Sequence, residues 1–336
     1  MELLIGTARG IFIAGAHGRV KPGAGAEQRS VRHLSRANGH VLAGTDDGVV
    51  RSIDGGFSWT PSGIAGAFVW DMAAAPDAPQ TLYAVTEPAA LFRSRDGGRA
   101  WAEMPSFRQA PGVEEWCLPR TEIAGRARTV TVDPTDPAHW LIGVEVGGVY
   151  ETLDGGASWR FLRPGGNPDI HVMVRHPVKS SRVFASTGFG RPVNTQEPME
   201  QRIAGVFRSE DGGATWQYEW QGMQPPYTRP LCIDARPPHA VTVASAPTAF
   251  SSLKDEGGAH AVIYQRDDLS DAWRSLGDAA HAPSPVNFHA VTPDPEVVSG
   301  VLVGTETGEV WRVSPTAAWT LLTADLPMVQ VLLPLT

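Results

Sequence analysis

The sequence predicts an all-β fold in which seven four-stranded antiparallel blades close into a ring, a seven-bladed β-propeller. Three observations favour it: a turn motif of eight residues occurs four times, short apolar strands ending in proline turns recur between the copies, and the two ends of the chain each supply part of one blade. A ring of six blades is the alternative. Because the repeats are spread evenly, residues 1–336 are expected to form a single domain.

The repeated motif reads Ser/Thr-x-Asp-Gly-Gly-x-x-Trp, and we call its four copies the Asp boxes. They are Ser52–Trp59, Ser94–Trp101, Thr152–Trp159 and Ser209–Trp216. Asp-Gly-Gly predicts a tight turn because glycine adopts positive φ without steric cost. The Asp and Ser/Thr side chains can hydrogen-bond the backbone of the turn, and the Trp can pack over it. These aspartates are therefore given a structural role: Asp54, Asp96, Asp154 and Asp211.

Each blade is expected to contain strand A, a proline turn, strand B, a loop, strand C, an Asp box and strand D. The spacing supports this order, since Pro76 and Asp96 lie 20 residues apart, and so do Pro134 and Asp154. Two degenerate copies of the box, at Tyr264–Trp273 and Val301–Trp319, add two more blades to the expected number. These repeats account for the second to seventh blades.

The first blade is expected to be split between the two ends of the chain. Leu3–Thr7 and Gly10–Ala14 read as its strands B and C, and Met328–Pro334 reads as its strand A. Pairing the last strand with the first closes the ring. A closed ring is favoured over a linear array because it leaves no exposed sheet edge.

The Asp boxes resemble the repeats, also called bacterial neuraminidase repeats, of a group of β-propellers. That group includes sialidases, a family of xyloglucanases, sortilin-type receptors and a photosystem assembly factor. The resemblance covers most of the chain and implies the propeller fold. It implies no single activity, because the box serves the fold and each member carries its own site.

Composition argues against several classes of partner. The net charge is −8 and no run of Lys or Arg occurs, which argues against nucleic acid or an anionic membrane. No apolar stretch approaches the roughly 20 residues of a membrane span. The N-terminal segment lacks the basic region of a signal peptide, so a cytoplasmic location is expected. The two cysteines, Cys117 and Cys232, are expected to be free thiols.

The direction of the strands predicts which face binds a ligand. Strands alternate in direction, so A–B turns and Asp boxes share one face, while B–C and D–A loops share the other. The second face carries nearly all the added length, in residues 106–126, 189–203 and 247–260. Because loops on a rigid scaffold commonly carry binding sites, a ligand is expected at the channel mouth opposite the boxes.

Polar residues gather at that mouth. Where strand B ends, Thr is the usual residue, but Glu87 and Glu145 replace it in adjacent blades. Two carboxylates across a groove can serve as acid and base in glycoside hydrolysis, so this pair is predicted to be catalytic. The residues predicted to bind the ligand are Trp70, Asp71, Arg128, His171, Arg191, Arg229, His289 and Glu306.

These residues favour a carbohydrate or another small molecule as ligand, with a site that resembles that of a glycoside hydrolase. The alternative is a non-catalytic binding or scaffold propeller for a protein or peptide. A true sialidase is disfavoured, because no Arg-Ile-Pro-type triplet precedes the first box. No cofactor is expected, although a divalent cation in the channel stays open, with donors from Asp46, Glu87, Glu145, His171 and His289. The ligand's identity and the oligomeric state also stay open.

Overall fold

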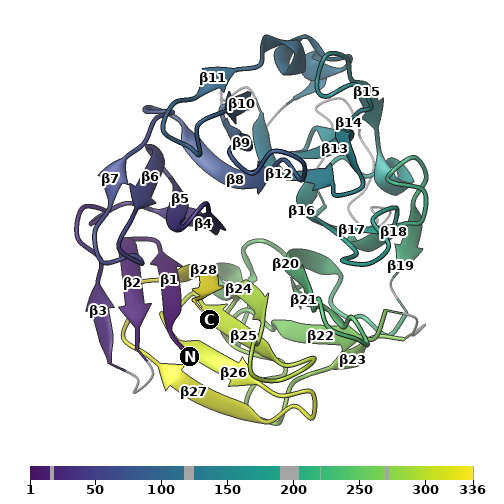
Figure 1. Cartoon of the computed structure of the whole chain (residues 1–336). Helices are drawn as coiled ribbons and strands as arrows, with labels where there is room; N and C mark the ends of the chain where they lie inside the picture. Colours follow the sequence, from purple (N-terminus) through teal and green to yellow (C-terminus); the bar gives the residue numbers. More distant parts are fainter. Residues whose placement is uncertain (16–18, 117–124, 190–203, 220, 269–271, 336) are drawn as a thin grey trace.

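Seven four-stranded antiparallel sheets surround a central channel in the computed structural model (Figure 1). The structure describes residues 1–15, 19–116, 125–189, 204–219, 221–268 and 272–335. The prediction of seven four-stranded blades is confirmed, and the alternative of six blades is wrong.

Blade 1 joins the two ends of the chain. It consists of β28 (Val329–Pro334), β1 (Leu3–Thr7), β2 (Gly10–Ala14) and β3 (Val20–Pro22). The pairing of β1 with β28 is antiparallel and runs from Leu3 opposite Pro334 to Thr7 opposite Val329. The predicted closure of the ring within this blade is therefore confirmed.

Each of the other blades is a meander of four consecutive strands. Blade 2 holds β4 (Val31–Ala37), β5 (His40–Thr45), β6 (Gly48–Ser52) and β7 (Thr60–Pro61), and blade 3 holds β8 (Phe68–Ala74), β9 (Leu82–Glu87), β10 (Leu91–Ser94) and β11 (Ala102–Glu103). Blade 4 holds β12 (Arg126–Asp133), β13 (Asp136–Glu145), β14 (Gly148–Thr152) and β15 (Arg160–Leu162), and blade 5 holds β16 (Ile170–Arg175), β17 (Val183–Thr187), β18 (Gly205–Ser209) and β19 (Gln217–Glu219). Blade 6 holds β20 (Tyr227–Ile233), β21 (Val241–Ala246), β22 (Val262–Arg266) and β23 (Arg274–Ser275), and blade 7 holds β24 (Phe288–Pro293), β25 (Val301–Thr305), β26 (Val310–Val313) and β27 (Trp319–Thr323).

The apolar core lies between adjacent blades, where the second strands are buried along their length. Glycines in these strands allow the next blade to pack closely. A Cβ on Gly143 of β13 would lie 2.5 Å from Cγ2 of Ile170, which belongs to blade 5. The close approach of β16 to β13 therefore requires glycine at this position.

The Asp boxes form the turns that the motif predicts. In the first box, Ser52 Oγ donates to Asp54 Oδ1 at 2.7 Å, and the Ser58 amide donates to the same oxygen at 2.9 Å. The Trp59 indole donates to the Gly56 carbonyl at 2.9 Å, which folds the ring over the turn. Hydrogen bonds with Ser58 and Ser52 lower the pKa of Asp54 to about 2. These contacts match the structural role expected of the box aspartates.

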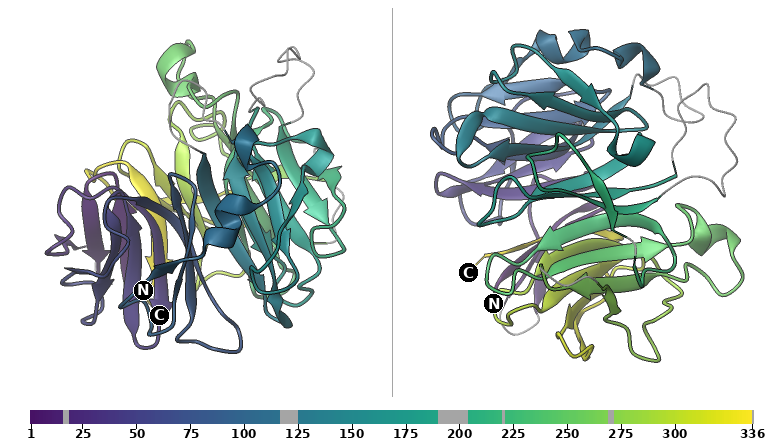
Figure 2. Two further views of the ribbon diagram at one scale, coloured as in Figure 1. Left: turned by 90° about the horizontal axis from the view of Figure 1, so that it is seen from above. Right: turned by 90° about the vertical axis from the view of Figure 1, so that its right-hand side faces the viewer.

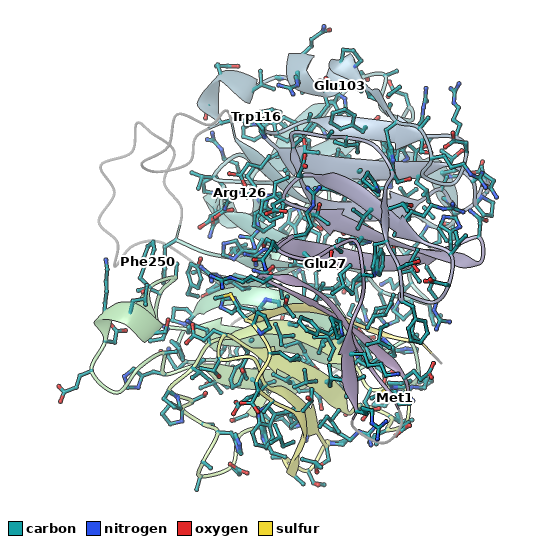
Figure 3. The ribbon with its side chains drawn as sticks, turned by 90° about the vertical axis from the view of Figure 1, so that its left-hand side faces the viewer. Met1, Glu27, Glu103, Trp116, Arg126 and Phe250 are labelled. Carbon is teal, nitrogen blue, oxygen red and sulfur yellow. The ribbon has the colours of Figure 1, made fainter. Side chains whose placement is uncertain are left out.

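Long connections rise on the face opposite the Asp boxes. The D–A connection between blades 3 and 4 carries the 3₁₀ helices η1 (Pro105–Gln109) and η2 (Val113–Glu115), and the B–C connection in blade 6 carries α1 (Ser251–Lys254). Trp116 and Phe250, from these two connections, lie on the same side of the molecule as Arg126, and α1 projects above the ring (Figures 2 and 3). A further 3₁₀ turn is η3 (Pro164–Gly166). None of the described helices combines the length and apolar character needed to cross a lipid bilayer.

Candidate functional site

The innermost strand of every blade contains a β-bulge at the same place, near its start. The register with the neighbouring strand shifts there in all seven blades. A bulge adds a residue that has no partner in the ladder and turns its side chain to a new direction. We call seven of the skipped residues, one from each blade, the bulge ring: Gln330, Arg32, Trp70, Arg128, His171, Arg229 and His289. In blade 6 the shift also skips Pro230.

All seven side chains of the bulge ring line one cavity of about 410 Å³ at the centre of the propeller. Because inner strands begin on the face opposite the Asp boxes, the ring stands at the predicted channel mouth. A second cavity of about 650 Å³ continues along the inner strands as far as the turns at Pro134 and Pro177. Six residues line both cavities: Arg32, Trp70, Arg128, Val172, Leu231 and Cys232.

The polar groups of this cavity are mostly hydrogen-bond donors. Three arginines, three histidines, one tryptophan and one glutamine face it, and no Asp or Glu is among the described residues that line it. The three ring arginines come from blades 2, 4 and 6, so they surround the channel axis instead of sharing one wall. Guanidinium groups in such an arrangement favour carboxylate, phosphate or sulfate.

Trp70 is the centre of a cationic cluster. The guanidinium carbons of Arg32, Arg126 and Arg128 lie 4.9, 4.7 and 4.8 Å from the centroid of its indole ring. Phe68 stacks beside the indole at 4.8 Å between ring centroids. Cation–π contacts of this kind offset part of the repulsion among the arginines. They also occupy indole surface that a sugar ring would otherwise stack on.

Glu87 and Glu145, the predicted catalytic pair, meet on one arginine. Arg126 donates to both oxygens of Glu87 at 2.6 and 3.0 Å and to Glu145 at 2.7 Å. Arg128 adds a longer bond to Glu145 at 3.2 Å. Burial raises the pKa of Glu145, but the surrounding cations, led by Arg128, outweigh burial and bring its pKa to about 2. The structure thus brings the two carboxylates together as acceptors within an ion-pair network.

His171, a member of the ring, is buried and lies beside Tyr227. Its Nδ1 contacts the Thr228 carbonyl at 2.5 Å, and its Nε2 lies 3.4 Å from the Tyr227 hydroxyl and 3.3 Å from Oδ1 of Asp169. Arg229 Nε donates to the same hydroxyl at 3.3 Å. Burial raises the pKa of Tyr227. This chain of contacts fixes two members of the bulge ring in place.

Among the described residues, Glu145, Asp169 and His171 are the three whose ligand atoms lie close enough to hold a cation, within 4.8 Å of one another. This group shares Glu145 and His171 with the predicted donors. Asp46 is exposed and lies outside it, as do Glu87 and His289. Arg126 and Arg128 already donate to Glu145, so a cation would compete with two guanidinium groups.

Asp71 and Glu306 stand behind the ring. Asp71 accepts from the Val130 amide at 2.9 Å and pairs with His33 Nδ1 at 2.8 Å, which ties blades 2, 3 and 4 together. Glu306 accepts from the backbone and side chain of Asn287 at 2.9 and 3.1 Å. Burial raises the pKa of Glu306, but hydrogen bonds with its neighbours bring that pKa to about 2.

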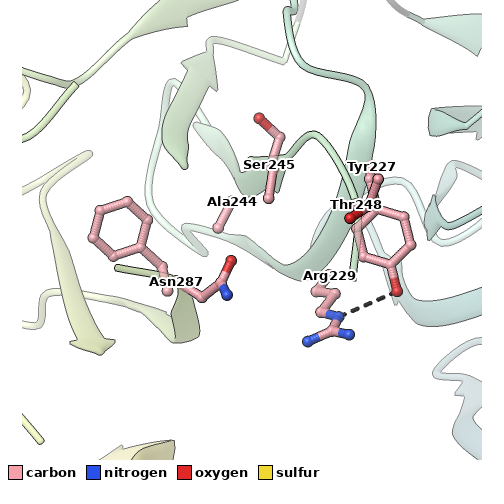
Figure 4. Close-up of a pocket in the computed structure, with 8 residues that line it drawn as sticks. Tyr227, Arg229, Ala244, Ser245, Thr248 and Asn287 are labelled. Carbon is pink, nitrogen blue, oxygen red and sulfur yellow. Dashed lines mark hydrogen bonds between the residues drawn. The ribbon is translucent and has the colours of Figure 1, made fainter. Parts of the chain in front are cut away.

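A small recess between blades 6 and 7 opens beside Arg229. Tyr227, Ser245, Thr248 and Asn287 line it, and Arg229 and Tyr227 meet at its edge (Figure 4). Its volume of about 10 Å³ is close to the space that a single water needs. A ligand would therefore occupy the central cavity, with this recess as a polar extension.

Five predicted ligand-binding residues belong to the bulge ring: Trp70, Arg128, His171, Arg229 and His289. Arg191 lies outside the described residues. The sequence prediction omitted Arg32 and Gln330 from the ring, and it omitted Arg126 and Tyr227 from the contacts around it. Arg32 and Gln330 are each the second residue of an inner strand. That shared position could have identified both of them as members of the ring.

Arg32 and Arg229 have no carboxylate within ion-pair distance in the part of the chain that the structure describes. Burial, and then the positive charges of Arg128 and Arg229, lower the pKa of Arg32 to about 9. Gln330, with its amide oriented to satisfy its neighbours, accepts from Nη2 of Arg32 at 3.1 Å. A neutral acceptor leaves the charge of Arg32 uncompensated.

No protein-family model matches the chain, and no curated protein sequence matches it either. Solved structures do share its fold. The GH74 enzyme of Niastella koreensis has a TM-score of 0.63 at 17% identity, covering 95% of this chain and 46% of that one. An ancestral GH74 enzyme gives 0.62 at 16% identity, covering 87% and 37%. YCF48 from Cyanidioschyzon merolae gives 0.59 at 13% identity, covering 88% and 87%.

The chain spans less than half the length of the two GH74 enzymes. At these identities the similarity shows the fold, a β-propeller, and carries no activity with it. The membership of the Asp-box family therefore stays a prediction, which rests on the four motif copies and the turns that they form.

Proposed function

We propose that this propeller binds a small ligand of the carbohydrate class at the channel mouth opposite the Asp boxes. The observation that carries the proposal is the convergence of seven bulge residues, one from each blade, on a cavity of about 410 Å³. That volume falls within the range of small-molecule sites. The GH74 glycoside hydrolases among the structural neighbours support a sugar ligand by analogy of fold alone.

We propose that the site binds a carbohydrate. Hydrolysis of that carbohydrate by Glu87 and Glu145 is a separate prediction. A general acid must hold its proton at the working pH, whereas the pKa of Glu145 is about 2. Glu87 accepts two bonds from Arg126 and one from the Trp70 indole at 3.0 Å. For this pair to hydrolyse a glycoside, ligand binding would have to release Glu87 from Arg126.

Calorimetric titration with a panel of mono- to tetrasaccharides, neutral and acidic, tests the proposal. We expect at least one sugar to bind, and Arg229→Met to weaken that binding, because Arg229 faces the cavity. Arg36→Met is the control, since Arg36 is exposed on β4 away from the ring. The absence of binding by every sugar would reject a carbohydrate site.

A protein or peptide partner is the second candidate. It is favoured by Phe250 and Leu253 beside the mouth, whose side chains are 50% and 84% exposed. Large apolar side chains exposed together are typical of protein contacts. Phe250→Ser with Leu253→Ser should abolish capture of such a partner and leave sugar binding unchanged. If the double substitution instead weakened sugar binding, α1 would be part of the small-ligand site.

A further inference from the structure

The bulge ring has a chemical bias that narrows the class of ligand. Its seven members include three arginines, two histidines, one tryptophan and one glutamine, and none carries a carboxylate. Four carboxylates contact members of the ring from outside this cavity: Glu87 beside Trp70, Glu145 beside Arg128, Asp169 beside His171 and Glu306 beside His289. None of the four lines the cavity itself. The wall therefore offers positive charge and N–H donors to whatever enters.

The arginines of the ring also remain incompletely satisfied. The buried Nε atoms of Arg32 and Arg128 have no hydrogen-bond partner among the described residues. Arg32 and Arg229 have no carboxylate partner there, and Arg128 has only a 3.2 Å contact with Glu145. Holding several like charges around one buried cavity costs free energy unless an anion joins them.

From this geometry we infer that the ring holds an oxyanion, a carboxylate, sulfate or phosphate group carried by the ligand, on the axis of the channel. This inference rests on the proposed function, since it names the group that a sugar would insert. Arg32, Arg128 and Arg229 come from three separate blades, so their donors approach the axis from three directions. An oxyanion has acceptor oxygens in matching directions, whereas a neutral hydroxyl would leave the guanidinium charges uncompensated.

The surroundings of Trp70 agree with this assignment. The guanidiniums of Arg32, Arg126 and Arg128 all lie within 5 Å of its ring centroid. Their contacts hold the arginines in position before a ligand arrives, which reduces the conformational entropy lost on binding. The same contacts leave less indole surface for stacking on a neutral sugar. Charge is thus the main recognition element that the ring offers.

Matched ligands separate the sources of the oxyanion. Calorimetry would compare galactose and glucose with galacturonate and glucuronate, and with the 6-sulfate and 6-phosphate of each parent sugar. We expect at least one charged form to bind tenfold or more tightly than its neutral parent. Arg32→Met should remove that preference, and Arg36→Met, the same change on the same strand, should keep it. Arg229→Met serves as the second variant if Arg32→Met does not fold.

The outcomes separate the inference from the proposed function. Equal binding of neutral and charged sugars would overturn the inference and leave the carbohydrate site standing. Binding of inorganic phosphate or sulfate that Arg32→Met abolishes, with no sugar bound, would support an oxyanion ring and reject the carbohydrate class. A charge preference that survives both Arg32→Met and Arg229→Met would place the anion elsewhere and overturn the inference.

Discussion

Arg126 holds Glu87 through two parallel hydrogen bonds, from Nε to Oε2 at 2.6 Å and from Nη2 to Oε1 at 3.0 Å. Its remaining Nη1 reaches Glu145 in the same blade at 2.7 Å. Since Glu87 belongs to blade 3 and Arg126 to blade 4, one guanidinium links two blades at the channel mouth. The side chains of all three residues are largely buried, which makes each of them dependent on the others.

Arg126→Met should destabilise the fold strongly. Removing the guanidinium leaves Glu87 with the Trp70 indole and Glu145 with the longer contact to Arg128, and we expect a loss of about 3 kcal/mol in the free energy of unfolding. Arg108→Met is the control, because Arg108 pairs with Glu103 at 2.6 Å on the exposed surface and should cost less than about 1 kcal/mol. Urea denaturation measures both. Equal losses in the two variants would show that the buried Arg126 network stabilises the fold no more than an exposed ion pair does.

Glu145→Gln should lose stability in a way that depends on pH. The folded pKa of Glu145, about 2, lies below its usual value of 4.5, so its charge stabilises the fold above pH 4.5. That contribution falls away as pH drops from 4.5 towards 2. At pH 7 we expect the variant to be less stable by on the order of 2–3 kcal/mol, with the difference shrinking at acid pH.

Unfolding at several pH values checks this prediction, and an aryl glycoside assay on the same samples checks catalysis. Hydrolysis that Glu145→Gln abolishes, with the unfolding midpoint unchanged at pH 7, would assign Glu145 to catalysis instead of to the ion-pair network. A stability difference that stayed constant from pH 7 to pH 3 would contradict the assigned cause.

Arg32→Met should raise stability when no ligand is present. Methionine keeps much of the packing on Trp70 and removes a charge that Arg128 and Arg229 oppose. We expect the melting temperature to rise by about 2 °C or more at low ionic strength, corresponding to about 1 kcal/mol. The gain should shrink in 0.5 M NaCl, because salt screens the repulsion. Scanning calorimetry at the two salt concentrations measures it, and a fall in melting temperature would show that Arg32 stabilises the fold.

Gly143→Ala should weaken the contact between blades 4 and 5. The added Cβ would lie 2.5 Å from Cγ2 of Ile170 and 2.7 Å from Cγ2 of Thr129, both β-branched and unable to turn away easily. Overpacking of this kind costs about 1–3 kcal/mol. Gly15→Ala is the matched control, since its Cβ would meet only the Arg19 carbonyl at 3.8 Å. A loss no larger than that of the control, by urea denaturation, would mean that the blades adjust freely.

The blades were predictable because their signals are local. Asp-Gly-Gly fixes a turn and Pro76 or Pro134 ends a strand whatever lies around them. The ring of ligand-facing residues was only partly predictable, because a bulge interrupts the alternation from which side-chain direction is read. Arg32 and Gln330 were missed for this reason.

The ion-pair network was beyond local reasoning for a different reason. Arg126 lies 39 residues from Glu87 along the chain and meets it only when blades 3 and 4 pack together. Glu87 and Glu145 stand out in the sequence as departures from Thr, and the carboxyl chemistry assigned to them followed from that departure alone. In the structure both carboxylates accept hydrogen bonds from Arg126, and their catalytic role stays a prediction.

The side chains of the bulge ring face the ligand cavity, and they lie outside the backbone pairing that forms the blades. Each blade contributes one side chain at one equivalent position, and that side chain takes no part in the strand pairing on which the blade depends. Substitutions at ring positions other than Trp70, Arg128 and His171, whose side chains make buried contacts with neighbouring blades, can therefore be combined to change what the channel recognises while the backbone stays constant. Libraries restricted to these positions should yield folded variants with new specificities more often than libraries drawn from the strands that surround them.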